Sequence, residues 1–444
     1  MRNNRGNAGN EAGQRGPRAI AAAAPLVWKF GGTSVADPDR LRAVAERLVA
    51  AHRQGRGVVA VLSAMGHTTD ELVAKAAQLT DRPPLRELDA LLSVGETISC
   101  ALAAMAITEL GETAVSLNGA QAGIHTDHRH GDARLREIRP DRIHEALDQG
   151  AIVLVTGFQG VCDHGDVTTL GRGGSDASAV ALAAALGATE CEIYTDVPAV
   201  YTADPRLVPD AGRRTSIRHE EMLELAEAGA AVLQPRAVEL AIAHNIDIHL
   251  RSSFSTEEGT WIRRTRGHGT ESGGTESGGT ESGGTESGGT ESGGSDIAGI
   301  AHRRHESLYT VKDLDIPELA AALAARGIPL GTLLPDTPGL RFTAPGTPTA
   351  DVTAALDAAG ASVRVDRELG SASVVSPGIA RKPHITARTL AALHAAGIAP
   401  HLVHTTAARI TVLVDTGALE DTVRLLHEEF LPTTPDAGET LAVA

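Results

Sequence analysis

Residues 26–34 read LVWKFGGTS, and this stretch decides the kind of fold to expect. The apolar run Leu26–Phe30 predicts a strand, and Gly31–Ser34 predicts the loop after it. A helix comes next, because Asp37 can cap its start and Pro38 suits its first turn. The apolar face of that helix consists of Leu41, Val44, Leu48 and Ala51. A strand, a glycine loop and a helix in this order are typical of proteins that alternate strands with helices.

The same alternation of apolar runs and helical periodicity continues to about Ile262. Further strands are predicted at Val58–Leu62, Ala114–Leu117, Ile152–Thr156, Glu192–Thr195 and Ile246–Leu250. Helices are predicted at Arg86–Leu110, Asp176–Leu186 and His219–Ala228. This pattern predicts an α/β domain over residues 26–262, with three αβα layers and a mostly parallel sheet covered on both faces. Ligands of such domains bind outside the carboxyl ends of the strands.

Length, composition and charge limit the class of protein. The chain has 444 residues, of which 42% are hydrophobic, so it can form two or three domains with real cores. A formal net charge of −16 argues against nucleic-acid binding, although local cations could still bind an anionic substrate. No apolar run approaches the ~20 residues that span a bilayer, so no membrane span is predicted. The cysteines Cys100, Cys162 and Cys191 lack CxxC spacing, which predicts a reduced, cytoplasmic protein without structural zinc.

The remainder of the chain is predicted to form a tail, a linker and two small domains. Residues 1–25 lack periodicity and predict a disordered N-terminal tail, not a signal peptide. The linker at 263–299 contains five copies of TESGG without an apolar residue, which predicts a flexible acidic tether. Residues 300–368 and 369–444 predict two α+β units of the ferredoxin-like kind. Their predicted elements are Ser307–Lys312, Pro317–Ala325, Ile328–Leu333, Ser371–Val375, Ile385–Ala396, His401–Thr405, Arg409–Val414 and Leu419–Glu429.

Two glycine-rich segments carry candidate chemistry. In Lys29–Ser34, glycines allow backbone N–H groups to approach a phosphate, and the lysine adds a positive charge. An ordinary strand-to-helix turn with a surface lysine explains that segment equally well. In TTLGRGGSD at Thr168–Asp176, Arg172 can grip a carboxylate in bidentate fashion, and a helix N-terminus favours anions. Ser175 or Asp176 can cap that helix, and for Asp176 a plain capping role is the alternative.

Two further motifs carry weaker signals. SVGE at Ser93–Glu96 places a carboxylate beside a glycine inside a predicted helix. Glycine costs about 1 kcal/mol in a helix, which hints at a ligand that approaches closely. Tyr194–Asp196 ends a predicted strand, and the loop Tyr201–Arg206 after it could hold a nucleotide base. A plain loop is the alternative interpretation of that last segment.

Together these segments resemble the aspartate kinases of the amino-acid kinase superfamily. The matching stretches are KFGGTS (29–34), LSAMGHTTDEL (62–72), SVGE (93–96), TTLGRGGSDASAVALAAALGA (168–188), EIYTDVPAVYTADPR (192–206) and EEMLELAEAGAAVLQPRAVELA (220–241). They follow one another in the same order between Leu26 and Ile262, so their conjunction is far more specific than any single motif. The C-terminal units resemble paired ACT domains, which bind lysine or threonine as feedback inhibitors in that family and suggest a homo-oligomer.

The resemblance implies that Mg²⁺·ATP phosphorylates L-aspartate to 4-phospho-L-aspartate, the first step of the aspartate-derived pathway toward lysine and threonine. It implies catalytic roles for Lys29, which stabilises the transferring phosphoryl group, and for Asp176, which organises the lysine and the metal-bound phosphates. The residues implied to bind aspartate are Ser63, Thr69, Glu96, Arg172 and Ser175. The residues implied to bind ATP are Gly31, Gly32, Thr33, Ser34, Thr195, Asp196, Tyr201 and Arg206. No residue is implied to bind the metal directly.

Two departures from the family pattern affect the expected function. Ala231 stands where the family usually has a lysine that contributes to nucleotide binding. The first ACT-like unit lacks the Lys-Pro-Gly turn and the Gln-Asn pair that usually hold the effector. We therefore expect a degenerate regulatory unit, weak feedback inhibition and service to a specialised metabolite. Two alternatives stay open: a catalytically impaired regulatory subunit that binds amino acids, and a kinase of the same superfamily that acts on glutamate or acetylglutamate.

Overall fold

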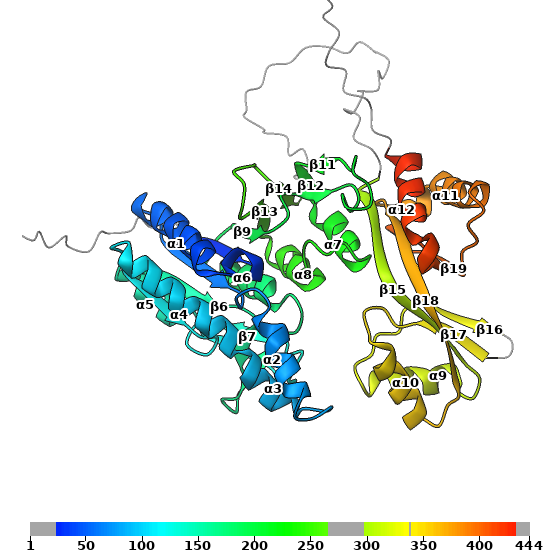
Figure 1. Cartoon of the computed structure of the whole chain (residues 1–444), viewed down its shortest axis with the longest axis horizontal. Helices are drawn as coiled ribbons and strands as arrows, with labels where there is room; N and C mark the ends of the chain where they lie inside the picture. The colour runs from blue at the N-terminus through cyan, green and yellow to red at the C-terminus, as the bar shows by residue number, and fades with distance from the viewer. Residues whose placement is uncertain (1–23, 265–296, 337–338, 432–444) are drawn as a thin grey trace, which may run out of the picture. The chain divides into compact units, whose positions relative to one another are not determined.

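The computed structural model describes residues 24–264, 297–336 and 339–431. The chain divides into two compact units, one within residues 1–198 and 243–257 and the other within 199–242 and 258–444 (Figure 1). We call them unit 1 and unit 2 and describe each by itself. Most of the predicted tail and the TESGG repeats lie outside the described residues.

Unit 1 is built on a parallel sheet with the strand order β13-β9-β1-β2-β6-β3. Its strands are β1 (Leu26–Phe30), β2 (Val58–Leu62), β3 (Ala114–Leu117), β6 (Ile152–Thr156), β9 (Glu190–Thr195) and β13 (Asp247–Ser252). The register pairs Phe30 with Leu62 on one side and with Tyr194 on the other, and Leu62 with Thr156. The carboxyl ends of β1, β2, β6 and β9 therefore meet at one edge of the sheet. This arrangement confirms the predicted parallel sheet.

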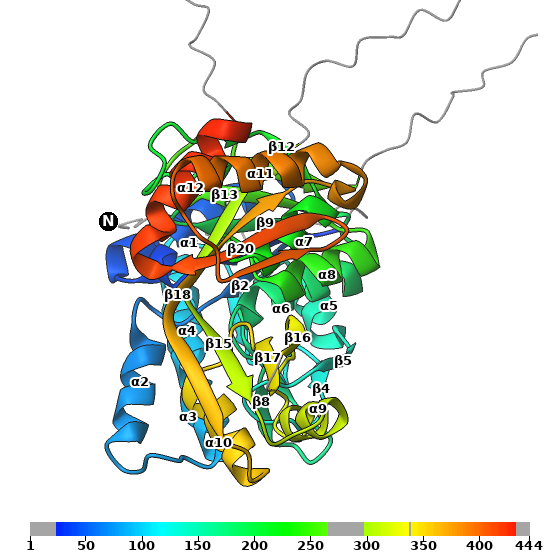
Figure 2. The same cartoon turned by 90° about the vertical axis from the view of Figure 1, so that its right-hand side faces the viewer.

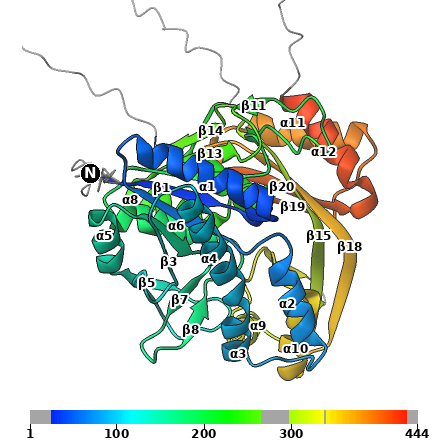
Figure 3. The same cartoon turned by 60° about the vertical axis from the view of Figure 1, so that its left-hand side comes forward.

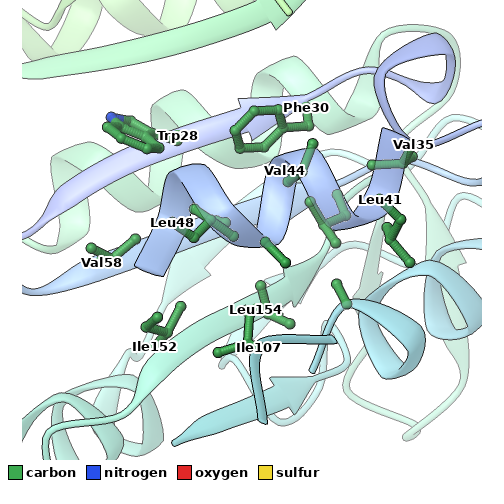
Figure 4. Close-up of a cluster of buried hydrophobic side chains, with 14 of the residues drawn as sticks. Trp28, Phe30, Val35, Leu41, Val44, Leu48, Val58, Ile107, Ile152 and Leu154 are labelled. Atoms are coloured by element: carbon green, nitrogen blue, oxygen red, sulfur yellow. The ribbon is translucent and has the colours of Figure 1, made fainter. Parts of the chain in front are cut away.

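The helices of unit 1 are η1 (Gly32–Val35), α1 (Pro38–Arg53), α2 (Thr68–Ala77), α3 (Leu85–Leu92), α4 (Val94–Glu109), α5 (Asp141–Asp148) and α6 (Gly174–Ala185). Asp37 caps α1 as predicted, because its carboxylate accepts a hydrogen bond from the Arg40 backbone N–H at 2.9 Å. α1 and α4 lie side by side, as Figure 3 shows. Their apolar faces and one face of the sheet form a core that includes Trp28, Phe30 and Leu48 (Figure 4).

A small second sheet in unit 1 was not predicted from the sequence. Its strand order is β5-β4-β7-β8. The strands are β4 (Ile124–Thr126), β5 (Leu135–Ile138), β7 (Gln159–Val161) and β8 (Val167–Thr169). Strands this short do not show the alternation of apolar and polar residues that sequence patterns rely on. β8 leads directly into the glycine-rich segment around Arg172.

Two helix predictions in unit 1 were wrong in detail. The helix predicted over Arg86–Leu110 is broken at Ser93, which separates α3 from α4. Neither Ser175 nor Asp176 caps α6, because the cap position is Gly173, whose left-handed backbone (φ 71°) makes the turn without a side chain. Both residues lie instead in the first turn of the helix.

The expectation about membrane spans also needs correction. Among the described residues, the stretch Leu85–Glu109 is long and apolar enough to cross a bilayer by length and composition. Core helices of soluble proteins pass the same test. The α4 part of this stretch contributes Cys100, Ala103 and Ile107 to the core shared with α1 and the sheet.

Unit 2 begins with β10 (Val200–Tyr201), β11 (Arg213–Arg214), β12 (Ser216–Arg218), α7 (His219–Glu227), α8 (Pro235–His244) and β14 (Thr260–Arg263). An antiparallel sheet follows, with the order β16-β17-β15-β18-β20-β19. Its strands are β15 (Gly299–Val311), β16 (Leu333–Asp336), β17 (Gly339–Thr343), β18 (Val363–Val375), β19 (Leu402–Thr405) and β20 (Arg409–Asp415). Its helices are α9 (Ile316–Ala324), α10 (Thr349–Ala358), η2 (Ile379–Arg381), α11 (Pro383–Ala395) and α12 (Thr416–Phe430).

The predicted β-α-β-β-α order is present in the second half of this sheet. The long strands β15 and β18 pair along most of their length, as Figure 2 shows, and β18 continues across residue 368. The strand predicted at Ile328–Leu333 was wrong, since β16 runs from Leu333 to Asp336. Gly331 and Thr332 already exchange backbone hydrogen bonds with Thr343, at 2.8 Å and 3.0 Å, but the regular pairing with β17 begins at Leu333.

Candidate active site

Lys29 and Asp176 form a buried ion pair at the predicted catalytic position. Side chains alternate along β1, so Trp28 and Phe30 enter the core with α1 while Lys29 points to the opposite face. There the Lys29 Nζ lies 2.6 Å from Oδ1 of Asp176, in the first turn of α6. The two side chains are only 11% and 10% exposed. A shielded pair of this kind has a strong mutual field and a defined geometry before any substrate arrives.

Glycines allow the loops after β1 and β2 to pack together beside this pair. A Cβ on Gly32 would lie 2.9 Å from the carbonyl oxygen of Ala64, closer than side chains tolerate. A Cβ on Gly31 would lie 3.5 Å from Lys29 Nζ, at ordinary contact distance, so Gly31 is directly next to the ammonium group. Gly31 also donates its N–H to the carbonyl of Tyr194 at 3.1 Å. The glycine loop is therefore tied to two neighbouring strand ends.

Glu96 presents a buried carboxylate oxygen that has no hydrogen-bond partner. A Cβ on Gly95 would lie 2.7 Å from the Cβ of Ala64, so only glycine lets α4 approach the loop after β2. Glu96 Oε1 accepts the Ala64 backbone N–H at 3.1 Å, whereas Oε2 has no partner among the described residues. Burial raises the pKa of Glu96 to about 7. A buried acceptor without a donor fits a ligand that brings one, such as an ammonium group.

Ser175 and Ser63 lie at the same edge of the sheet. A Cβ on Gly157, which follows β6, would come within 2.6 Å of Ser175 Oγ. Ser63 follows β2 and donates its backbone N–H to the carbonyl of Phe30 at 3.1 Å. These contacts join the segment of Asp176 to the strand ends of β1, β2 and β6. The structure thus brings five predicted residues to this edge: Lys29, Ser63, Glu96, Ser175 and Asp176.

Arg172 lies between two glycines in left-handed conformation, Gly171 (φ 74°) and Gly173 (φ 71°). Its side chain is exposed, and within the part of the chain that the structure describes it has no hydrogen-bond or ion-pair partner. A guanidinium group without an internal partner is available for an external carboxylate.

The other predicted site residues have fewer contacts with the Lys29–Asp176 pair and the loops beside it. Ser34 is buried and accepts a hydrogen bond from Ser253 Oγ at 2.6 Å, whereas Thr33 is exposed. Thr69 lies in the first turn of α2, but Thr68 is the residue that faces Gly95, with 3.7 Å between Cγ2 and a Cβ built there. Thr195 ends β9 and donates to the carboxylate of Asp196 at 3.1 Å.

Tyr201 and Arg206 belong to unit 2. Tyr201 is half-buried and packs against an apolar cluster that contains Ala203 and Leu207. The Arg206 guanidinium forms a bidentate ion pair with Asp204, at 3.0 Å and 2.7 Å, which lowers the pKa of that carboxyl group. Their proposed nucleotide contacts stay a prediction.

Sequence reasoning missed Ser253 as a neighbour of the glycine loop. Ser253 directly follows β13, so the rule that ligands bind beyond the carboxyl ends of parallel strands could have found it. Among residues 24–264, 297–336 and 339–431, no group of three or more His, Cys, Asp or Glu side chains is placed to hold a metal ion.

The fold and this site together define the class of protein. The family model described as the amino acid kinase family matches residues 25–252, and a model described as an ACT domain matches residues 373–430. The first match covers more than half of the chain and contains the described site of unit 1.

Individual relatives narrow the class to one family. The chain is 42% identical to an aspartokinase of Mycolicibacterium smegmatis over 423 residues, covering 91% of this chain and 96% of the relative. It is 41% identical to an aspartokinase of Corynebacterium glutamicum with the same coverage. The chain belongs to the aspartokinase family and is an enzyme of the aspartate kinase type.

Solved structures agree with that placement. E. coli aspartokinase III in complex with aspartate and ADP (R-state) has a TM-score of 0.73 at 23% identity, covering 91% of this chain and 99% of that one, and so supports the fold alone. Aspartate kinase from Synechocystis has a TM-score of 0.51 at 33% identity, covering 94% of this chain and 71% of that one.

Proposed function

We propose that the protein transfers the γ-phosphoryl group of ATP to the side-chain carboxylate of L-aspartate, giving 4-phospho-L-aspartate and ADP. The observation that carries this proposal is the buried Oε2 of Glu96, which has no hydrogen-bond partner among the described residues and lies at the same sheet edge as the Lys29–Asp176 pair. An ammonium acceptor and a buried lysine fit an amino-acid substrate that receives a phosphoryl group. The aspartokinase relatives at about 42% identity support the same reaction.

Aspartate would be recognised through its α-ammonium group and its α-carboxylate group. Glu96 would accept the substrate ammonium, because its Oε2 receives no hydrogen bond from the part of the chain that the structure describes. Arg172 would hold a carboxylate through its guanidinium fork. Ser63, Thr69 and Ser175 would line the remaining surface of the substrate. Binding of the ammonium group would also favour the ionised form of Glu96, since an opposite charge offsets burial.

Phosphoryl transfer would depend on position and charge more than on acid–base chemistry. A carboxylate oxygen is already a nucleophile at neutral pH, so no strong base is needed. Lys29 would stabilise the negative charge on the transferring phosphoryl group. Asp176 would hold the Lys29 side chain in place for this role. Gly31, Gly32, Thr33 and Ser34 would line the phosphates, and Thr195, Asp196, Tyr201 and Arg206 would contact the nucleotide.

Mg²⁺ would be bound by the phosphates of ATP, since oxygen ligands are the ones it prefers, and Asp176 would organise the metal-bound phosphates together with its partner Lys29. When bound with ATP, the ion would supply charge neutralisation of the phosphates. The protein's own residues would hold the amino acid and direct its carboxylate toward the phosphates.

The wider role follows from the same proposal. The product would feed aspartate-derived amino-acid biosynthesis in the cytoplasm, and the degenerate first ACT-like unit would suit supply of a specialised metabolite with weak feedback control. The ACT-type units would join copies of the chain into a homo-oligomer.

A coupled ADP-release assay with aspartate, glutamate and N-acetylglutamate tests the reaction. We expect turnover with aspartate and a loss of kcat by orders of magnitude in Lys29→Ala and Asp176→Ala, with folding verified by circular dichroism. No aspartate-dependent ADP release would contradict the proposal. Aspartate binding without turnover would point to the regulatory subunit, and preference for another acid would point to a related kinase.

A further inference from the structure

A buried carboxylate, Asp89, anchors the segment that leads to Arg172. Asp89 lies in α3 and is 1% exposed. Its Oδ1 accepts the Thr169 hydroxyl at 2.5 Å, both oxygens lie 3.0 Å from the Gly131 N–H, and Oδ2 lies 2.9 Å from Nδ1 of His130. Both oxygens are thus satisfied, which makes a buried carboxylate tolerable and geometrically well defined.

The partners of Asp89 are directly joined to the glycine-rich segment. Thr169 ends β8, three residues before Arg172, and its carbonyl accepts the Ala133 N–H at 2.8 Å. A Cβ on Gly171 would lie 3.0 Å from the carboxylate of Asp132. The loop around residues 130–133 therefore packs against the backbone immediately before Arg172, and Asp89 holds both parts together.

The same helix is joined to the segment that carries Glu96. Ser93 donates its N–H to the Asp89 carbonyl at 3.0 Å and stands at the break between α3 and α4. The buried amide of Gln159 donates to the Ser93 carbonyl at 2.9 Å, which holds this break in place. Glu96 follows three residues later, in the first turn of α4.

We propose that Asp89 is a positioning residue that sets the placement of Arg172 relative to Glu96 and thereby the affinity for the amino-acid substrate. This inference rests on the proposed function. Arg172 has no partner of its own in the described part of the chain, so its placement comes from the backbone around it. One end of that backbone is fixed by α6 and the other by Asp89 through Thr169.

Steady-state kinetics of Asp89→Asn test this role. The amide keeps the volume of the carboxylate but turns an NH₂ group toward the donors that now surround it. We expect the KM for aspartate to rise at least tenfold and the KM for ATP to stay within twofold. Glu87→Gln is the matched control, because it makes the same change at an exposed position of the same helix.

Thr169 provides a second route if Asp89→Asn fails to fold. Thr169→Val removes the hydroxyl and is expected to raise the KM for aspartate selectively, whereas Thr169→Ser keeps the hydroxyl and is expected to restore most of the affinity. Equal changes in both KM values, or an unchanged KM for aspartate with a lower melting temperature, would overturn the positioning role. If the wild type acts only on another acid, the proposed function fails, and the same variants measured with that acid still decide the role of Asp89.

Discussion

At the scale of single residues, the candidate site combines buried charges with one exposed cation. Lys29 and Asp176 compensate each other inside the protein, and removal of one leaves the other buried and unpaired. Glu96 has no such partner and holds its charge at a cost, which its raised pKa reflects. The Arg172 side chain is exposed. In the proposed reaction, the buried pair would serve the phosphoryl group, Glu96 the substrate ammonium and Arg172 a carboxylate.

Glu96→Gln should make the protein more stable above pH 7 and impair binding of the substrate ammonium. The folded pKa of about 7 lies above the ordinary value of 4.5, so the native state binds the proton more tightly and loses stability as pH rises from about 4.5 to 7. Above pH 7 the free energy of unfolding of the variant should exceed that of the wild type by up to about 3 kcal/mol. At pH 4 the two proteins should have equal free energies of unfolding. Urea denaturation at pH 4 and pH 8 measures this. A variant that is less stable at pH 8 would show that Glu96 is not strained by burial.

Arg172→Lys should impair recognition of aspartate although the charge is kept. Lysine cannot form the bidentate fork, so we expect a loss of about 1.5–3 kcal/mol in kcat/KM for aspartate. The KM for ATP should be nearly unchanged. An unaltered KM for aspartate would remove Arg172 from the substrate site.

At the scale of elements, the turn after α7 carries the most consequential departure from the family pattern. Gly229 has a left-handed backbone (φ 110°), and a Cβ there would come within 2.4 Å of the His302 carbonyl oxygen. Ala230 donates its N–H to the carbonyl of Leu225 at 2.9 Å. Ala231 itself is exposed, so the turn is shaped by its neighbours and has room for a longer side chain at this position.

Ala231→Lys should therefore strengthen ATP binding without loss of stability. The added charge would restore the nucleotide contact that the family usually has, and we expect a lower KM for ATP with an unchanged KM for aspartate. Ala231→Met, of similar length and no charge, is the control and should leave the KM for ATP as it is. A neutral or harmful effect of the lysine would mean that the nucleotide pocket has been rebuilt around alanine.

At the scale of the whole molecule, control by an effector needs a contact that differs between two states. Unit 2 has a charged contact between α7 and the antiparallel sheet. The Arg409 guanidinium lies 3.0 Å from the carboxylates of both Glu224 and Glu227, and Arg303 donates to the carbonyl of Glu227. We expect any coupling between α7 and this sheet to pass through these side chains, independently of the linker at 263–299. The expectation of weak feedback then depends on the missing effector residues of the first ACT-like unit.

Lysine and threonine, singly or together at millimolar concentration, should inhibit the enzyme less than tenfold. The assay is run once at saturating ATP and aspartate and once at KM concentrations, so that effects on affinity and on turnover are both seen. Stronger inhibition, above roughly 1.4 kcal/mol of coupling, would show that the altered unit still binds an effector.

The sequence by itself determined the features that depend on neighbours along the chain. The strands β1, β2, β3 and β6 lie at the predicted residues, because each is a short, mostly apolar run. The sequence also predicted the loop at Gly31–Gly32 and the glycine-rich segment around Arg172. Glycine adopts backbone conformations that other residues avoid, so clustered glycines indicate such loops. The resemblance then assigned roles to these segments.

Only the tertiary structure decided the features that depend on contacts across the chain. The break at Ser93, the left-handed cap at Gly173 and the later start of β16 each follow from packing that no periodic pattern records. The hydrogen bond from Ser253 to Ser34 joins residues 219 positions apart. Asp89 looks like an ordinary polar residue of an amphipathic helix until folding surrounds it with Gly131 and Thr169. A carboxylate becomes an anchor only when its donors come from distant parts of the chain, and local sequence carries no signal of that meeting.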